Sequence, residues 1–208
     1  MKISVAIPSS VLTDSQHLRD KTAKLGVIAR VCSIYRVSNI YVFNDVSGNY
    51  ARDGDFSKLI LEYLETPQYL RRTIFPLMES LRYAGALPPL RIPHHKSTSR
   101  AQNIRPGEIR EGLISRQGNQ YKADAGLGVP IPIEGGLVNT GRHTVLFTSS
   151  YPNLKCKVVD RDYSNEYWGY RVIKRKSISE LLKECADALT IITSRDGQSV
   201  EEVWDEFC

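Results

Sequence analysis

The stretch K-L-G-V-I-A-R-V-C-S-I-Y-R-V-S-N-I-Y-V-F-N-D, residues 24–45, changes its hydrophobic period halfway along. In its first part, apolar side chains recur at steps of three and four residues, the spacing of one helix face: Leu25, Ile28, Ala29, Cys32 and Tyr35. The run at 40–43 is apolar, β-branched and aromatic, which is typical of a buried strand. The stretch predicts a helix followed by a strand in an α/β domain, with Asp45 at the sheet edge where such domains bind ligands.

The flanking residues extend this unit in both directions. Ile3, Val5 and Ile7 predict a first strand, so that a helix from about residue 14 to 36 connects two parallel strands. Residues 46–55 are polar and predict a loop. Residues 56–83 predict two or three helices, because Pro67 and Pro76 interrupt the helical pattern.

The composition changes between residues 96 and 165. This region holds eight of the 14 glycines and shows no helical period. It contains five short runs separated by turn sequences, at 108–116, 120–125, 129–133, 143–149 and 154–158. Five short antiparallel strands predict a small closed barrel. The region has ten Lys and Arg against six Asp and Glu, so it carries +4 of the chain's net +5. This charge favours an anionic partner.

Helical signals return near the end of the chain. Ser177 and Glu180 have the spacing of a capping box, residues 189–192 predict a buried strand, and residues 200–208 predict the start of another helix. We therefore expect an α/β domain in two parts, residues 1–92 and 166–208, interrupted by an all-β insertion at residues 93–165.

Several classes of protein and site are not indicated. No apolar run approaches the ~20 residues of a membrane-spanning helix, so we expect a cytoplasmic protein with no membrane partner. Four scattered cysteines without a C-x-x-C pair indicate neither a zinc site nor a disulfide scaffold. Adjacent side chains of an extended chain point apart, so His94 and His95 are interpreted as polar linker residues and no metal site is predicted.

Arg30 is the one residue of the predicted helix that does not fit a core face. It follows Ala29 inside the apolar turn, where a guanidinium needs an anion. A snorkelling side chain or a structural ion pair explains this position, and so does a phosphate ligand; spacing alone favours the structural explanation.

Cationic side chains mark two candidate RNA-binding surfaces. Arg71 and Arg72 lie beside an amide and an aromatic ring in Q-Y-L-R-R, a mixture that suits RNA and equally a solvated helix face. The insertion places cations around one tyrosine, which is typical of barrels that bind single-stranded nucleic acid: Arg100, Arg105, Arg110, Arg116, Tyr121 and Lys122.

Several motifs resemble those of the SPOUT-class (alpha/beta knot) RNA methyltransferases. The stretch G-V-I-A-R-V-C-S-I-Y-R-V-S-N-I-Y-V resembles their first motif, and further pieces resemble an archaeal and eukaryotic subfamily with an OB-like barrel inserted in the knotted domain. These pieces are I-P-S-S at 7–10, L-R-D-K-T at 18–22, Y-L-E-T-P-Q-Y-L-R-R at 63–72, L-P-P-L-R-I-P-H-H at 87–95, R-E-G at 110–112 and Y-W-G-Y at 167–170. The resemblance implies an RNA substrate and S-adenosylmethionine as methyl donor. It also implies that Arg30 is the motif-one arginine that engages the RNA, which makes it the candidate catalytic residue.

One departure from the resemblance limits what we expect of residues 1–208. In SPOUT proteins the donor pocket, the knot and the dimer contact come from a C-terminal stretch with two further glycine-rich loops and a final helix, and this stretch does not follow T-S-R-D-G here. We therefore expect weak binding of S-adenosylmethionine, assign no cofactor-binding residues, and expect a homodimer only where the knot is present. Two alternatives stay open: a non-catalytic RNA-binding protein on the same scaffold, and a small-molecule α/β enzyme.

Overall fold

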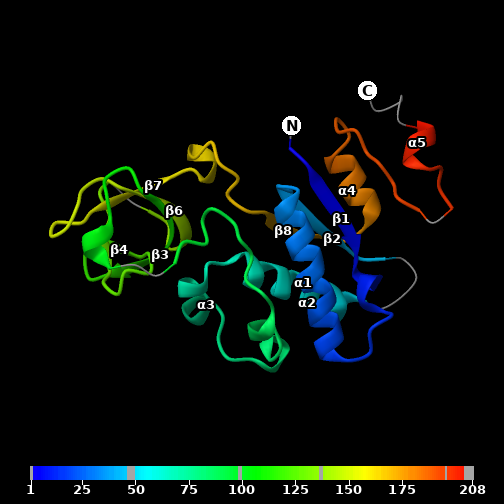
Figure 1. Cartoon of the computed structure of the whole chain (residues 1–208), viewed down its shortest axis with the longest axis horizontal. Helices are drawn as coiled ribbons and strands as arrows, with labels where there is room; N and C mark the ends of the chain where they lie inside the picture. Colours follow the sequence, from blue (N-terminus) through cyan, green and yellow to red (C-terminus); the bar gives the residue numbers. More distant parts are fainter. Residues whose placement is uncertain (1, 46–49, 98–99, 136–137, 195, 204–208) are drawn as a thin grey trace.

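The computed structural model describes residues 2–45, 50–97, 100–135, 138–194 and 196–203. Its strands form two sheets, one parallel and one antiparallel, which lie at opposite ends of the molecule (Figure 1). Among the described residues, no helix is long and apolar enough to span a membrane.

The parallel sheet has three strands in the order β1-β2-β8: β1 (Ser4–Pro8), β2 (Asn39–Phe43) and β8 (Arg171–Arg175). The strands pair in register, with Ala6 opposite Tyr41 and Tyr41 opposite Ile173. The predicted strand–helix–strand unit is confirmed. The sequence analysis missed β8, because its short run R-V-I-K-R is mostly charged and becomes a strand only by pairing with the buried β2.

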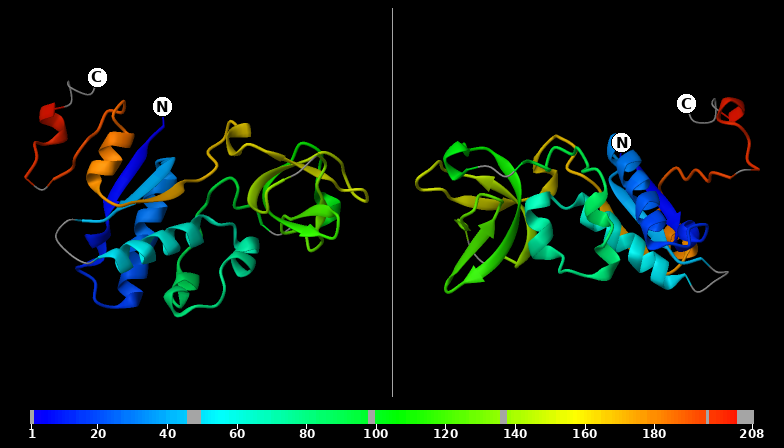
Figure 2. Two further views of the ribbon diagram at one scale, coloured as in Figure 1. Left: turned by 180° about the vertical axis from the view of Figure 1, so that it is seen from behind. Right: turned by 60° about the horizontal axis from the view of Figure 1, so that its bottom comes forward.

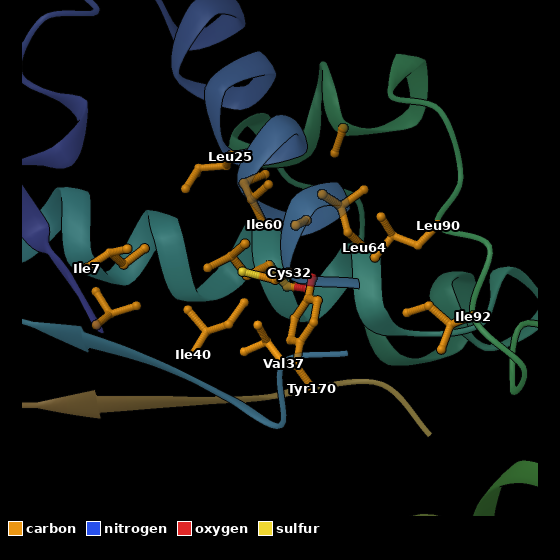
Figure 3. Packing of buried hydrophobic residues seen from close by; sticks show 14 of the residues in the cluster. Ile7, Leu25, Cys32, Val37, Ile40, Ile60, Leu64, Leu90, Ile92 and Tyr170 are labelled. Atoms are coloured by element: carbon orange, nitrogen blue, oxygen red, sulfur yellow. The ribbon is translucent and has the colours of Figure 1, made fainter. Parts of the chain in front are cut away.

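Two helices supply the core of this lobe. In α1 (Leu18–Ile34) the side chains of Leu25, Ala29 and Cys32 are buried. In α2 (Ala51–Glu65) Ile60, Leu61 and Leu64 are buried, and α1 packs against α2. Figure 3 shows Leu25, Cys32, Ile60 and Leu64 of these helices converging with Ile40 of β2 and with Tyr170, which precedes β8. The predicted face of α1 is confirmed except at Tyr35, which caps the helix end and is 68% exposed.

Other boundaries differ from the prediction. A 3-10 helix η1 (Ser9–Leu12) follows β1, and α1 starts only at Leu18. The predicted loop at 46–55 is wrong from Ala51 onward, where α2 begins; residues 46–49 lie outside the described chain. A separate α3 (Gln68–Ile74) follows Pro67, as the interruption at this proline predicted.

The C-terminal part also differs. Ser177 accepts a hydrogen bond from the Glu180 backbone N–H at the start of α4 (Ile178–Glu184), as the capping signal predicted. The strand predicted at 189–192 is wrong, because this segment is coil and its apolar side chains are exposed, 76% at Leu189 and 82% at Ile192. A last helix, α5 (Val200–Val203), agrees with the start of the helix predicted at 200–208, and residues 204–208 of that prediction lie outside the described chain.

The antiparallel sheet has the strand order β5-β4-β3-β6-β7. Its strands overlap all five predicted runs: β3 (Ile109–Gln117), β4 (Gln120–Asp124), β5 (Ile131–Pro132), β6 (Gly141–Phe147) and β7 (Cys156–Val159). The sheet is curled (Figure 2) and encloses its own core, and a bridge between Ile133 and Cys156 joins its two edges at one point. Short 3-10 helices complete the described connections: η2 (Glu79–Leu81), η3 (Ala84–Ala86), η4 (Ala101–Asn103) and η5 (Arg161–Tyr163).

Candidate functional site

The two sheets are joined around one buried carboxylate, Glu65, at the end of α2. Its side chain is only 5% exposed. Its Oε2 accepts from Arg142 Nη1 at 2.6 Å, and its Oε1 accepts from Arg161 Nη2 at 2.5 Å and lies 3.1 Å from His94 Nε2. These partners come from β6, from η5 and from the chain that leads into the antiparallel sheet. Glu65 therefore connects both lobes through charge-assisted hydrogen bonds.

A second carboxylate, Glu111 of β3, extends the network. It accepts from Arg142 Nε at 2.8 Å, from Thr144 Oγ1 at 2.9 Å and from Trp168 Nε1 at 2.6 Å. Arg142 thus lies between two buried carboxylates and donates to both. We call Glu65, Glu111, Arg142, Arg161 and His94 the inter-sheet charge cluster.

The charges of this cluster compensate one another. Burial raises the pKa of Glu65, but Arg142, His94 and Arg161 outweigh it and hold that pKa well below its ordinary value. Burial also raises the pKa of Glu111, but the charge of Arg142 outweighs burial, and the pKa lies below its ordinary value. Burial lowers the pKa of Arg142, and the two carboxylates raise it more. Both carboxylates are therefore ionised at neutral pH, and the cluster is a set of ion pairs between buried carboxylates and half-buried arginines.

The Y-W-G-Y motif brings its backbone against this cluster. Gly169 has a φ of +82°, and a Cβ there would lie 2.6 Å from both Glu65 Oε1 and His94 Cε1. The flanking hydroxyls hold the motif in place, because Tyr167 donates to the Val37 carbonyl at 2.9 Å and Tyr170 to the Leu61 carbonyl at 2.9 Å. Only glycine fits at position 169 without displacing the ion pairs.

The interpretation of the two histidines as linker residues is wrong. The His94 ring is fully buried and stacks in a tilted arrangement on Trp168, with 5.7 Å between the ring centroids. His95 Nε2 lies 2.6 Å from the Glu65 carbonyl oxygen, and its Nδ1 lies 2.9 Å from that of Leu90. Both rings tie the P-H-H segment to the end of α2. Within the described ranges, no three His, Cys, Asp or Glu side chains are grouped to hold a metal ion.

A cleft of about 590 Å³ opens beside the cluster, and we call it the inter-sheet cleft. Side chains of α2, α3, β3, β6 and β8 line it, and it combines arginines with apolar groups. The lining residues are Glu62, Glu65, Thr66, Thr73, Ile74, Phe75, Leu113, Gly141, Arg142, Arg161, Tyr170, Arg171 and Val172.

Two of the predicted RNA-binding arginines have internal partners. Arg71 donates to the carbonyls of Thr66 at 2.8 Å and Leu64 at 2.9 Å, and it stacks 4.8 Å from the centre of the Tyr63 ring. Arg110 is 4% exposed and donates from Nε to Glu108 Oε1 at 2.8 Å. Arg71 caps the end of α2, while Arg110 is an ion-paired arginine of β3, and neither presents a free guanidinium to solvent.

The remaining predicted RNA contacts lie at the surface. Arg72, Arg100, Arg105 and Arg116 are exposed, while Tyr121 and Lys122 are half-buried on β4. Tyr121 also packs against the core of the antiparallel sheet. Arg72 is on α3, whereas the other five residues belong to the antiparallel lobe, the part of the chain built around the antiparallel sheet. The structure therefore places the predicted contacts on two separate parts of the molecule.

Arg30 is not on the apolar face of α1. Its side chain is exposed, because the neighbouring Ala29 takes the buried position and a step of one residue turns the helix by ~100°. The sequence-based premise of a guanidinium inside the apolar turn is therefore wrong. The assignment of Arg30 as the catalytic residue stays a prediction.

The sequence analysis missed Glu65, Glu111, Arg142 and Arg161. Two of them carried a usable signal, since Glu65 directly follows buried Leu64 and Glu111 sits at the centre of R-E-G in a strand. A carboxylate that a helix or strand buries needs a cation, and an arginine of the insertion could have been expected to supply it. The choice of Arg142 and Arg161 required the tertiary structure.

The carboxyl edge of the parallel sheet holds a second, smaller polar group. Asp45 accepts from Ser9 Oγ at 3.3 Å, from the Ser10 backbone N–H at 3.3 Å and from Ser10 Oγ. Nearby, Asn44 Oδ1 just after β2 and Ser57 Oγ on α2 are buried with no hydrogen-bond partner among the residues that the structure describes. Asp45 therefore lies at the predicted edge, where it joins the ends of β1 and β2.

Comparison with known sequences places this fold in a family. Residues 2–207 match the family described as "Putative RNA methyltransferase". An uncharacterized protein of Halobacterium salinarum is 30% identical over 95% of this chain and 69% of its own length. The 28S rRNA (uridine-N(3))-methyltransferases of Homo sapiens and Drosophila melanogaster are 34% and 32% identical. The match to the human enzyme covers 95% of this chain and 59% of that protein, and the match to the fly enzyme covers 97% and 47%. The chain belongs to this family of RNA methyltransferases.

Proposed function

We propose that this protein methylates ribosomal RNA with S-adenosylmethionine as donor, and that the antiparallel lobe, residues 93–165, holds the RNA. The observation that carries the proposal is the surface of this lobe. Arg100, Arg105, Lys122 and Lys157 form no ion pair with any residue in the described ranges. Unpaired cations on a curled sheet suit a phosphate backbone, which binds by releasing counterions.

The inter-sheet charge cluster supports the same function. It fixes the RNA-holding lobe on the parallel sheet through buried ion pairs, so the RNA would be held at a set distance from the sheet edge. Positioning of two substrates contributes a large part of the barrier reduction in group-transfer reactions. By analogy with the uridine-N(3) enzymes among the relatives, we propose N3 of a uridine as the acceptor. The N3 proton would leave to a base, and the electron pair that it frees on N3 would bond to the methyl carbon as the bond between that carbon and the donor sulfur breaks, with its electrons staying on sulfur.

The residues at the carboxyl edge of the parallel sheet have groups that suit a methyl donor of the nucleoside type. Asp45 and the unpartnered Asn44 Oδ1 can accept from ribose hydroxyls or an amino group, and Ser57 Oγ can donate or accept. The donor supplies an electrophilic methyl group when it is bound. The expectation that residues 1–208 bind it weakly stays a prediction, which isothermal titration with S-adenosylmethionine decides.

The test of the function combines binding and transfer. Fluorescence anisotropy of labelled single-stranded RNA should show binding that weakens as salt rises, with a slope that reports the number of phosphate contacts. The double variant Arg105→Glu/Arg116→Glu should weaken binding to all sequences alike, because phosphate contacts carry no base information. Arg19→Glu, an exposed charge reversal on α1, is the matched control.

Transfer is then followed as radiolabel from S-adenosylmethionine into a ribosomal RNA fragment. RNA binding without transfer would favour the non-catalytic RNA-binding alternative. Absence of RNA binding at low salt would contradict the proposal and favour the small-molecule enzyme.

A further inference from the structure

Asp45 differs from the other aspartates at the carboxyl edge of the parallel sheet. Asp53 and Asp55 lie in the first two turns of α2, where Asp53 pairs with Lys21 of α1 at 2.7 Å and Asp55 pairs with Lys174 of β8. Asp45 pairs with no cation among the residues that the structure describes. Those residues leave its negative charge uncompensated, and such a carboxylate attracts a proton or an N–H donor of a ligand.

The hydrogen bonds of Asp45 leave one acceptor position open. Its Oδ1 accepts from Ser9 Oγ and from the Ser10 backbone N–H, each at 3.3 Å, and its Oδ2 accepts from Ser10 Oγ. A carboxylate oxygen can accept two hydrogen bonds, so one position on Oδ2 remains. Asp45 is half-buried, which leaves the side chain within reach of a ligand at the sheet edge.

The carboxylate is also held in a fixed place. Ser9 is fully buried, and Pro8 lies opposite Phe43 in the register of β1 and β2, so the two strands end side by side. The serine donors therefore tie Asp45 to the end of β1. A base that is already in position needs no rearrangement to meet its substrate, and this favours proton transfer.

The residues proposed to contact the methyl donor are neighbours of Asp45. Asn44 precedes it in the chain, and Ser57 lies one turn after Gly54 in α2. A Cβ at Gly54 would lie 3.5 Å from Asn44 Oδ1 and 3.2 Å from Ser9 Cβ, so α2 approaches the ends of both strands here. A base at position 45 would therefore lie beside the methyl donor.

Other titratable side chains suit this role less well. Glu65 and Glu111 belong to the inter-sheet charge cluster and are buried in ion pairs. Glu184, which follows β8, pairs with Arg175. His17 is exposed at the start of α1 and makes no side-chain hydrogen bond with a described residue. This histidine is the competitor that an experiment has to separate from the aspartate.

RNA has to pass the parallel sheet to reach this edge. The chain enters β8 from the antiparallel lobe, so that lobe lies on the amino side of the strands and Asp45 on the far side (Figure 1). Arg52 in the first turn of α2 and Lys176 directly after β8 are exposed, and neither forms an ion pair with a described residue. These cations can hold phosphates on the side of Asp45, and ribosomal RNA is long enough to contact both ends of the molecule.

We propose that Asp45 is the catalytic base, which accepts the N3 proton of the target uridine on Oδ2. The N3–H bond breaks and the freed electron pair bonds to the methyl carbon, while the bond from that carbon to the donor sulfur breaks with its electrons staying on sulfur. Asp45 then gives the proton to water. This inference rests on the proposed function and adds to it the residue that activates the acceptor.

The test measures methyl transfer into a ribosomal RNA fragment between pH 7 and pH 9. Asparagine keeps the shape of aspartate but takes no proton, so Asp45→Asn should lower the rate at pH 7 about a hundredfold or more. The loss should shrink as the pH rises, because solvent then removes the N3 proton. RNA made with 5-fluorouridine, whose N3 proton is more acidic, should recover the rate at a lower pH. His17→Gln is the matched control and should keep the wild-type rate.

Binding checks the same contact without methyl transfer. Anisotropy compares the wild-type affinity for uridine RNA and for 5-fluorouridine RNA of the same sequence as the pH rises. The affinity for the 5-fluorouridine RNA should fall about threefold relative to uridine RNA, because its ionised N3 faces the Asp45 carboxylate. Asp45→Asn should remove this difference.

Three outcomes overturn the inference and leave the RNA function standing. They are wild-type transfer by Asp45→Asn at pH 7, a loss that neither pH nor 5-fluorouridine relieves, and equal pH dependence of the wild-type affinity for the two RNAs. A loss in His17→Gln that pH relieves would assign the base to that histidine instead. If the wild-type chain transfers no methyl group to RNA, the proposed function is overturned together with the inference.

Discussion

The arginines of this protein fall into two groups that differ in their surroundings rather than in their chemistry. Arg142 and Arg161 lie between the two sheets and donate to buried carboxylates, whereas Arg105 and Arg116 lie at the surface of the antiparallel lobe. A guanidinium that has lost its water must keep its anion, while an exposed one exchanges water for a ligand at little cost. The inner group therefore contributes to stability, and the outer group carries the proposed RNA contacts.

The largest effect should come from the inner group. Arg142→Ala leaves Glu65 and Glu111 buried without their shared cation and should lower the free energy of unfolding by about 3–5 kcal/mol. Urea denaturation followed by circular dichroism measures this. Arg116→Ala is the control and should stay within about 0.5 kcal/mol of wild type. Equal losses in both variants would remove the distinction between the two groups.

Gly169→Ala should have the next largest effect. The residue has a positive φ and its Cβ would meet Glu65 and His94, so we expect a loss of about 2–3 kcal/mol in unfolding free energy. Gly118 also has a positive φ, +63°, but a Cβ there would meet nothing within 4 Å. Gly118→Ala therefore carries the backbone strain alone, and its loss should be smaller, about 1 kcal/mol. A loss at Gly118 as large as at Gly169 would show that the ion pairs do not constrain position 169.

Acid should weaken the contact between the sheets. The folded-state pKa of Glu65 is held below its unfolded value of about 4.3, so the unfolded chain binds more protons as the pH falls. The stabilisation is complete above that unfolded value and is lost as the pH falls below it, toward the folded-state pKa. Urea midpoints measured from pH 6 to pH 3 should decrease, and Glu65→Gln should show a shallower decrease below pH 5. An unchanged slope in Glu65→Gln would assign the acid sensitivity to other carboxylates.

The smallest effect on stability should come from Arg30. Its side chain is exposed, so Arg30→Met and Arg30→Lys should both change the unfolding free energy by less than about 0.5 kcal/mol. If Arg30 holds a phosphate in a bidentate arrangement, both variants should lose methyl transfer, because lysine cannot reproduce the planar fork. A melting curve beside a transfer assay tests this. Retained transfer in Arg30→Met would end the catalytic assignment.

The sequence by itself predicted the elements whose pattern is local. The sequence predicted α1, β2 and the five runs of the antiparallel sheet correctly. Each of these elements buries one face, and the spacing of its apolar residues shows which face that is. The capping box was also predicted correctly, because its two partners, Ser177 and Glu180, lie within one helical turn. Residues 189–192 show the limit of this reasoning, because the strand pattern there has no neighbouring strand to pair with in the described chain.

The tertiary structure alone decided which charges meet. Glu65 and Arg161 are 96 residues apart, Glu65 and Arg142 are 77 apart, and no periodicity connects them. It also shows that Arg71 and Arg110, which were predicted as RNA contacts, have internal partners. Arg30, which was predicted inside the apolar turn, lies at the surface. Burial of a charge depends on the packing of two lobes against each other, and this depends on contacts between distant residues that local sequence patterns do not encode.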